Sequence, residues 1–290
     1  MSYIICMKSV TIHTPAKVNL FLEILGERSD GFTEIRSLMQ AVSLYDEVRI
    51  EKADKGLVLS ASETSIPLDY NNSAAKAWGV FCRVVGSELG AKIHIGKRIP
   101  PESGLGGGSS DAAATLAGLS KVYDIKLDTE TLMKIGAAVG SDVPFFFGSG
   151  TSLVEGRGEK ITDIDIEMDY ALLLIKPRYG MRTAEAYSLA RKTLTDVEPK
   201  VKIENYDFNR RIIDLCDIGN ALEPVFLSKF PESKNIKDRL LETGASYAAL
   251  SGSGSAFFGL FEDINTAKTG QKQFPDLWTA VVKPVGIDYF

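Results

Sequence analysis

The sequence has 290 residues and a mass of 31.5 kDa, which is about the length of two ordinary domains. Its 44% hydrophobic and 24% charged residues exclude a disordered or collagen-like chain. The 33 Lys and Arg residues against 38 Asp and Glu residues give a net charge of −5, which argues against a broad basic surface for nucleic acid.

The cysteines predict neither a disulfide framework nor a zinc site, because they are scattered and odd in number: Cys6, Cys82 and Cys216. Such a pattern is typical of a reducing cytosol. The beginning of the chain lacks a secretory pattern, and no apolar run is long enough to span a bilayer, so we expect a cytoplasmic protein that binds no membrane. His13 and His94 lie in alternating stretches, where structural strand histidines are expected.

The first half of the sequence combines strands with helices. Apolar residues at every second position predict strands over residues 18–24, 35–42, 47–51 and 92–97, and residues 29–31 predict a hairpin turn. Apolar residues at helical spacing predict a helix over 72–89. After the last of these strands, a glycine-rich loop leads into helices expected over 111–123 and 128–139.

The second half has a different order of elements. We expect strands over residues 170–176, 247–250, 256–261 and 278–283 and helices over residues 184–193, 208–217, 222–229, 236–243 and 264–274. Without the additional helices, this order is β-α-β-β-α-β, the ferredoxin-like unit. The polar stretch at 161–169 predicts a boundary, and the chain is therefore expected to form two α+β domains.

The glycine-rich segment gives the clearest indication of a binding site. It reads Pro100-Pro101-Glu102-Ser103-Gly104-Leu105-Gly106-Gly107-Gly108-Ser109-Ser110-Asp111-Ala112-Ala113. Glycines let backbone N–H groups approach phosphate oxygens, and the N-terminus of the following helix adds partial positive charge. The alternative is a flexible linker or a tight turn with a serine as helix cap. The segment is neither a P-loop, which needs lysine at position 109, nor a dinucleotide-binding fingerprint, which needs glycine there.

Other segments leave two interpretations open. Asp142 precedes the apolar residues 143–147, which could desolvate the carboxylate and tune it as a base, but an Asx turn or a helix cap is equally consistent. Lys17 by itself is an ordinary strand-end lysine. Residues 156–159 predict a hairpin turn, and residues 251–255 predict either a tight strand connection or a second loop that faces phosphates.

Taken together, residues 14–20, 104–113, 140–147, 156–159 and 251–254 resemble the GHMP small-molecule kinases. Within that family, the segments PAKVNLFLEILGERSDGF, GLGGGSSDAA and DVPFF are similar to one branch, and the resemblance runs from about Thr14 to Phe258. It implies the two-domain α+β fold of the family. The N-terminal kinase domain with the ATP phosphate loop is then expected over 1–165, and a C-terminal ferredoxin-like domain over 166–290.

The resemblance also implies an activity. The branch implies ATP-dependent phosphorylation of the 2-hydroxyl of 4-diphosphocytidyl-2-C-methyl-D-erythritol, in non-mevalonate isoprenoid precursor biosynthesis. It implies ATP as co-substrate, Mg²⁺, a cytidine-diphosphate-linked polyol as the small-molecule partner, no nucleic acid, and a monomer or homodimer. Two alternatives are another kinase of the family with a different alcohol acceptor, and a nucleotide-binding regulator on the same fold without catalysis.

The family's motif positions assign roles to residues of this sequence. Lys17 and Asp142 are expected as the catalytic pair, and the expected ATP phosphate loop consists of Pro100, Pro101, Glu102, Ser103, Gly104, Leu105, Gly106, Gly107, Gly108, Ser109 and Ser110. The substrate is expected to contact Lys17, Asn19, Phe32, Thr33, Asp142 and Tyr187. Ser110 is a candidate Mg²⁺ ligand, and Asn72 aligns with an asparagine near the adenine.

Three departures from the family pattern affect recognition. Phe32 replaces the usual tyrosine that stacks on the cytosine, and Thr33 replaces the histidine that reads its edge. Residues 102–103 are Glu-Ser instead of the usual Gly-Ala. Because a carboxylate beside a triphosphate is repulsive, we expect Glu102 to point away from it.

Overall fold

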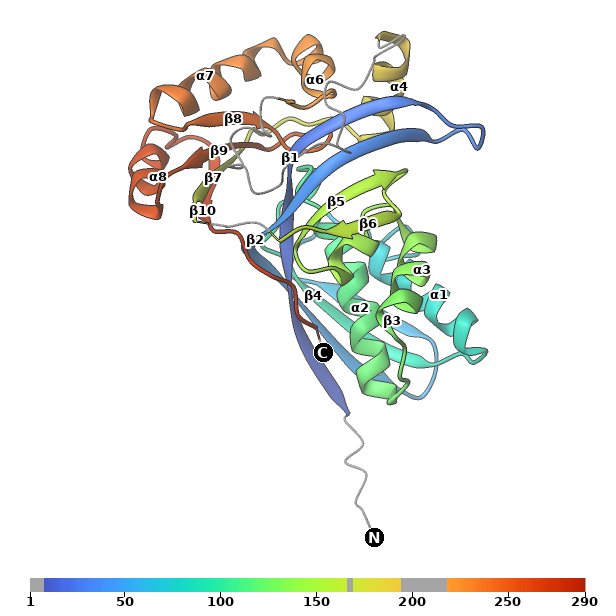
Figure 1. The fold of residues 1–290 in the computed structure, drawn as a ribbon. Helices are drawn as coiled ribbons and strands as arrows, with labels where there is room; N and C mark the ends of the chain where they lie inside the picture. The colour runs from blue at the N-terminus through green and yellow to red at the C-terminus, as the bar shows by residue number, and fades with distance from the viewer. Residues whose placement is uncertain (1–7, 166–168, 194–217, 290) are drawn as a thin grey trace.

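The computed structural model describes residues 8–165, 169–193 and 218–289. Two β-sheets form its frame: a mixed six-stranded sheet from the N-terminal half and a four-stranded antiparallel sheet from the C-terminal half (Figure 1). The predicted α+β class is confirmed. The expected boundary between residues 165 and 166 stays a prediction.

The N-terminal sheet is built around one long hairpin. Its strands are β1 (Ser9–Glu27), β2 (Thr33–Ala53), β3 (Leu57–Ala61), β4 (Gly90–Gly96), β5 (Thr151–Gly156) and β6 (Lys160–Asp163). The order is β3-β4-β2-β5-β6, and β1 pairs with β2. The two strands predicted over 35–42 and 47–51 form a single strand, because β1 pairs along almost all of β2. Between the two predicted strands, the pairing shifts in register at Pro15 and Ala16 of β1.

Three helices and a short 3-10 helix cover one face of this sheet (Figure 1). They are α1 (Ser73–Val85), α2 (Gly107–Tyr123), α3 (Thr129–Val139) and η1 (Pro144–Phe147). Asn72 caps α1 by accepting a hydrogen bond from the backbone N–H of Ala74, and Gly86, in the left-handed conformation, caps its C-terminal end. Helix α2 begins at Gly107 rather than at the predicted Asp111. The last glycines of the loop are therefore part of the first helical turn.

The C-terminal half has the predicted ferredoxin-like order. Its strands are β7 (Ala171–Lys176), β8 (Tyr247–Leu250), β9 (Phe257–Phe261) and β10 (Trp278–Val282), in the sheet order β10-β7-β9-β8. Its helices are α4 (Thr183–Thr193), α6 (Glu223–Lys229), η3 (Pro231–Ser233), α7 (Lys234–Glu242) and α8 (Ile264–Gln271). The helix predicted over 208–217 lies outside the described residues, as do Cys6 and Cys216.

Three apolar cores hold these layers together. One lies between the N-terminal sheet and helices α1–α3, and a second joins the C-terminal sheet to its own helices. The third lies between the two sheets, where Val18 and Leu20 pack with Leu172 and Leu174. The neighbours Leu173 and Ile175 belong to the second core instead, as the alternation of strand side chains requires. Burial of this third core holds the loops of both halves together around one cavity.

None of the helices in the described part of the chain has the length and apolar composition that crossing a lipid bilayer requires.

Candidate active site

A cavity of about 690 Å³ lies where the two halves of the chain meet. Its volume is in the usual range for a small-molecule site. The N-terminal half contributes the end of the β1–β2 hairpin, the glycine-rich loop and the segment after α3. The C-terminal half contributes the start of α4 and the connection between β8 and β9. The sequence segments singled out above therefore line one space.

Lys17 and Asp142 meet in this cavity although 125 positions separate them in the numbering. Lys17 Nζ lies 3.4 Å from Asp142 Oδ2, with the lysine side chain 4% exposed and the aspartate side chain 32% exposed. Lys17 Nζ also donates a hydrogen bond to Asn19 Oδ1 (2.5 Å). The carboxylate therefore has one face on a buried ammonium group and another open to the cavity.

The apolar run after Asp142 anchors this carboxylate. Phe145 and Phe146 are fully buried, and η1 has no side-chain cap. Asp142 therefore does not cap η1, although a helix cap was one of its two expected roles. Buried aromatic side chains fix the position of the segment, and the charged group remains available to the cavity.

The glycine-rich loop has the close packing that glycine allows. A Cβ on Gly106 would lie 2.8 Å from Lys17 Cγ, and a Cβ on Gly104 would lie 2.1 Å from the Ser251 carbonyl oxygen. Both glycines adopt positive φ angles, 76° at Gly104 and 74° at Gly106. Gly106 is the N-cap residue of α2 and offers no side-chain cap, so the N–H groups of the first turn remain available for an anion.

The connection between β8 and β9 supports the glycine-rich loop and also lines the cavity. Ser251 Oγ donates to the Gly104 carbonyl (3.1 Å) and accepts from the Asn19 N–H (3.3 Å). Asn220 Nδ2 donates to the carbonyls of Leu250 and Gly252, both at 2.8 Å. Gly252 and Ser253 line the cavity. The loop is therefore a tight strand connection that also lines the cavity, and its role toward phosphates stays a prediction.

Most residues of the predicted phosphate loop line the cavity, and two do not. The lining residues are Pro100, Pro101, Glu102, Ser103, Gly104, Gly106, Gly107, Gly108 and Ser109. Leu105 is buried in the core between the sheets. Ser110 is fully buried, and its hydroxyl donates to the Pro15 carbonyl (2.6 Å) instead of reaching the cavity. The direction of the Glu102 carboxylate stays a prediction.

The other expected substrate residues belong to the lining of the same cavity. Asn19, Phe32, Thr33 and Tyr187 all line it, and Phe32 is 46% exposed. Burial raises the pKa of Tyr187, and the charge of Asp142 raises it further. Asn72, which aligns with an asparagine near the adenine, also lines the cavity. The structure thus brings together the expected side chains from both halves.

Two arginines beside Phe32 were not predicted as site residues. The guanidinium of Arg157 lies 4.8 Å from the centre of the Phe32 ring, and it comes from the predicted hairpin turn between β5 and β6. Arg191 Nη1 donates to the Gly31 carbonyl (3.2 Å) and lies four residues after Tyr187 in α4. Both line the cavity. The sequence of residues 156–159 indicated a turn but gave no sign of the aromatic contact.

A buried charge cluster beside Gly107 was also not predicted. Lys97 Nζ donates to Asp46 Oδ2 and to Asp111 Oδ2, the latter at 2.9 Å. Burial lowers the pKa of Lys97, but the charges of Asp111 and Asp46 outweigh this effect, and the pKa is raised. Lys97 lines the cavity, yet two carboxylates already balance its charge. It therefore adds little free positive charge for phosphates.

Asp111→Asn is expected to reduce the dependence of stability on pH. Burial raises the pKa of Asp111 to about 7, from an ordinary value of 3.8. Between these values, the folded protein holds one proton more than the unfolded chain. The free energy of unfolding therefore falls as the pH rises from about 4 to about 7, by at most about 1.4 kcal/mol per pH unit for one group. An amide does not titrate, so the variant loses this contribution.

Urea unfolding at pH 5 and pH 8 measures the difference. The control is Asp54→Asn, which replaces an exposed carboxylate and should retain the pH dependence of the wild type. If the stability of Asp111→Asn changes with pH as much as that of the wild type, the raised pKa of Asp111 is wrong.

Comparisons with known proteins were made on both sequence and structure. The family model of the GHMP kinases N terminal domain matches residues 72–150, and the model of the GHMP kinases C terminal domain matches residues 205–279. A 4-diphosphocytidyl-2-C-methyl-D-erythritol kinase of Carboxydothermus hydrogenoformans is 42% identical over 260 residues, which are 89% of this chain and 90% of that protein.

Two solved structures match along almost their whole length. A crystal structure of 4-(cytidine 5'-diphospho)-2C-methyl-D-erythritol kinase has a TM-score of 0.74 at 28% identity and covers 94% of this chain and 99% of its own. Homoserine kinase from Cytophaga hutchinsonii has a TM-score of 0.75 at 19% identity and covers 100% of this chain and 98% of its own. The second likeness concerns the fold alone, so the fold does not select the acceptor.

Proposed function

Because the chain belongs to the GHMP kinase family, and within it to the 4-diphosphocytidyl-2-C-methyl-D-erythritol kinases, we propose that it transfers the γ-phosphoryl group of ATP to the 2-hydroxyl of 4-diphosphocytidyl-2-C-methyl-D-erythritol. The product serves non-mevalonate isoprenoid precursor biosynthesis. The observation that carries the proposal is the pair of Lys17 and Asp142, which faces the uncapped N-terminus of α2 in one cavity.

Each part of the cavity has a role in this proposal. The backbone N–H groups of Gly107, Gly108 and Ser109 hold the phosphates of ATP, where the first turn of α2 also supplies partial positive charge. Asp142 accepts the proton of the acceptor hydroxyl, and Lys17 offsets negative charge on the migrating phosphoryl group. Phosphoryl transfer has a loose transition state, so positioning and charge neutralisation supply most of the rate increase.

Mg²⁺ is part of the proposal as a cation that neutralises charge on the phosphates. In the described ranges, no group of three or more His, Cys, Asp or Glu side chains is arranged to hold a metal ion. This is compatible with Mg²⁺, which commonly binds through one or two protein oxygens together with substrate phosphates and water. Ser109 lines the cavity and is the proposed protein ligand, in place of the buried Ser110.

Recognition of the cytosine is assigned to the aromatic end of the cavity. We infer that Phe32 and Tyr187 bracket the base, with the Arg157 guanidinium holding the outer face of the Phe32 ring. Thr33 is buried at the position where the family has histidine, so its hydroxyl or backbone makes the edge contact. A monomer or homodimer and a cytoplasmic location complete the proposal.

A comparison of acceptors tests this function. ADP release is measured with ATP, Mg²⁺ and either 4-diphosphocytidyl-2-C-methyl-D-erythritol, mevalonate or homoserine. We expect turnover with the cytidine compound alone, and we expect Thr33→His to act on the same acceptor. Equal or faster turnover of mevalonate or homoserine would contradict the assignment. If the wild type turns over no acceptor while it binds ATP tightly, the chain is a nucleotide-binding regulator instead.

A further inference from the structure

The chain after β10 returns to the N-terminal half (Figure 1). Three backbone hydrogen bonds hold this segment, residues 283–289, which we call the return segment. The Ser43 N–H donates to the Lys283 carbonyl (2.9 Å), the Val285 N–H donates to the Ala41 carbonyl (3.0 Å), and the Ile287 N–H donates to the Ser149 carbonyl (3.2 Å). The return segment is therefore attached both to β2 and to the stretch between η1 and β5.

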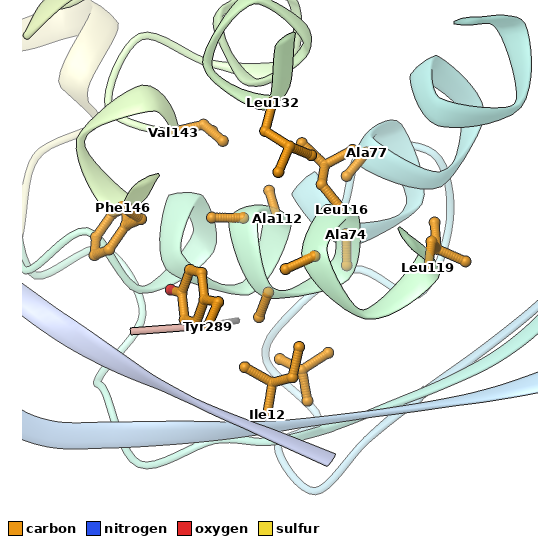
Figure 2. Packing of buried hydrophobic residues seen from close by; sticks show 14 of the residues in the cluster. Ile12, Ala74, Ala77, Ala112, Leu116, Leu119, Leu132, Val143, Phe146 and Tyr289 are labelled. Atoms are coloured by element: carbon orange, nitrogen blue, oxygen red, sulfur yellow. The ribbon is translucent and has the colours of Figure 1, made fainter. Parts of the chain in front are cut away.

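The side chain of Tyr289, in the return segment, is buried in the core between the N-terminal sheet and helices α1–α3. The residue is 6% exposed and lies in the same core as Ile12, Ala112 and Phe146 (Figure 2). Its ring meets that of Phe147 edge to face, with the ring centres 6.1 Å apart. Phe147 belongs to η1, which begins two residues after Asp142. Tyr289 thus packs against the segment that positions the proposed base.

The hydroxyl of Tyr289 begins a chain of buried hydrogen bonds. It lies 2.6 Å from Thr14 Oγ1, Thr14 Oγ1 lies 2.5 Å from Ser110 Oγ, and Ser110 Oγ donates to the Pro15 carbonyl (2.6 Å). A carbonyl oxygen only accepts, so the hydroxyl proton of Ser110 is committed to Pro15. Thr14 then donates to Ser110, whose hydroxyl oxygen and carbonyl oxygen (3.1 Å) both lie within reach of Thr14 Oγ1, and Tyr289 donates to Thr14. The direction of the whole chain follows from its last acceptor.

This hydrogen-bond chain joins two of the proposed catalytic elements. Thr14 lies three residues before Lys17 on β1, and Ser110 lies in the first turn of α2, beside the glycines that face the cavity. The Lys17 N–H makes a second connection, because it donates to the Leu105 carbonyl (2.9 Å). Together with the contact to Phe147, Tyr289 therefore touches the supports of Lys17, the phosphate loop and Asp142.

We propose that Tyr289 is a positioning residue for phosphoryl transfer, holding β1, the start of α2 and η1 at the separations that the reaction requires. Tyr289 does not line the cavity and acts through Thr14 and Phe147. This inference rests on the proposed function, because its rate measurements use the proposed reaction. Small displacements of reacting groups reduce rates strongly, because the attacking hydroxyl must be held near its acceptor.

Tyr289→Phe tests the role of the hydroxyl while the ring remains in the core. We expect kcat to fall about tenfold and the KM for the acceptor to change less than about twofold, since a displacement of about 1 Å costs up to about 10²-fold in rate. The dissociation constant of the β,γ-imido analogue of ATP should rise about threefold, because Ser110 supports the helix turn whose N–H groups hold the phosphates.

The matched control is Tyr123→Phe. Tyr123 lies at the far end of α2, and its hydroxyl donates to the Gly90 carbonyl. Each of the two variants loses one buried hydrogen bond, so both should lower the thermal unfolding midpoint by a similar amount. Tyr123→Phe should nevertheless leave kcat and analogue binding unchanged. Equal kcat values in the two variants would overturn the proposal, since they would show only a general loss of stability.

Thr14 gives a second test that does not alter the return segment. Thr14→Val breaks the hydrogen-bond chain and should lower kcat as Tyr289→Phe does, whereas Thr14→Ser keeps the hydroxyl and should approach wild-type activity. The double variant Thr14→Val/Tyr289→Phe should be no slower than either single variant, because both remove the same connection. Additive losses would overturn the proposed chain.

The binding measurement separates this inference from the proposed function. If the wild type does not phosphorylate the cytidine compound, the proposed function fails, but analogue binding still tests the role of Tyr289. Unchanged binding in Tyr289→Phe would then overturn the inference by itself, and a threefold loss that Tyr123→Phe does not show would support it.

Discussion

Asp142→Asn is expected to lower kcat by about 10²–10⁴-fold, the contribution that a well-placed general base makes. The amide keeps the size of the side chain and can still accept a hydrogen bond from Lys17, but it cannot take the proton of the acceptor hydroxyl. Affinity for the β,γ-imido analogue of ATP should stay within about twofold, because the N–H groups that hold the phosphates belong to α2. Steady-state kinetics and calorimetry measure the two quantities.

Asp128→Asn is the matched control for this substitution. Asp128 caps α3 by accepting a hydrogen bond from the Thr131 N–H, and asparagine caps helices as well as aspartate does. Activity and stability should therefore stay close to those of the wild type. An Asp142→Asn variant with more than about a tenth of wild-type kcat would show that Asp142 is not the base, given the magnitudes usual for this role.

Lys17→Met is expected to lower kcat by about 10²–10³-fold, the usual loss when one group that stabilises developing charge is removed. Methionine keeps a long unbranched side chain where Lys17 packs beside Gly106, so the loop should retain its position. The ammonium group itself is lost, and Asp142, which is 32% exposed, remains hydrated. Rapid-quench measurement of phosphoryl transfer would isolate the chemical step.

The relation between Lys17 and Asp142 gives a sharper result than either variant alone. If the two groups act as a unit on one hydroxyl, the double variant should be little slower than the slower single variant. Losses that add fully would mean that the two residues act independently. Lys134→Met is the control for loss of an exposed lysine, since its side chain is 73% exposed and should not affect kcat.

The glycine-rich loop shows which part of the site could be predicted from the sequence. Four glycines between Gly104 and Gly108 indicate a backbone that approaches its surroundings closely, and the structure places Gly104 and Gly106 in the left-handed conformation. The helix that follows was also predicted, although it begins at Gly107, so that Gly107 and Gly108 belong to its first turn.

Long-range neutralisation of charge could not be predicted in the same way. Lys97 ends an alternating strand and Asp111 opens a helix, so each has an ordinary local explanation. Only the packing of α2 against β1 and β2, together with the pairing of β2 with β4, brings both beside Asp46 and buries the three side chains together. The Arg157 contact with Phe32 has the same origin, because the β5–β6 turn and the β1–β2 turn meet only in the folded sheet.

The strand pattern, the helix order and the residue types of the site were determined by the sequence itself, because backbone preferences and side-chain alternation act between near neighbours in the chain. The tertiary structure alone decided that Lys17 and Asp142 face one another, that Ser110 turns inward to Pro15, and that Tyr289 contacts Thr14 and Phe147. These outcomes depend on burial of the core between the N-terminal sheet and helices α1–α3, which contains Val143, Phe146 and Tyr289. That burial sets the distances between segments that are far apart in the chain.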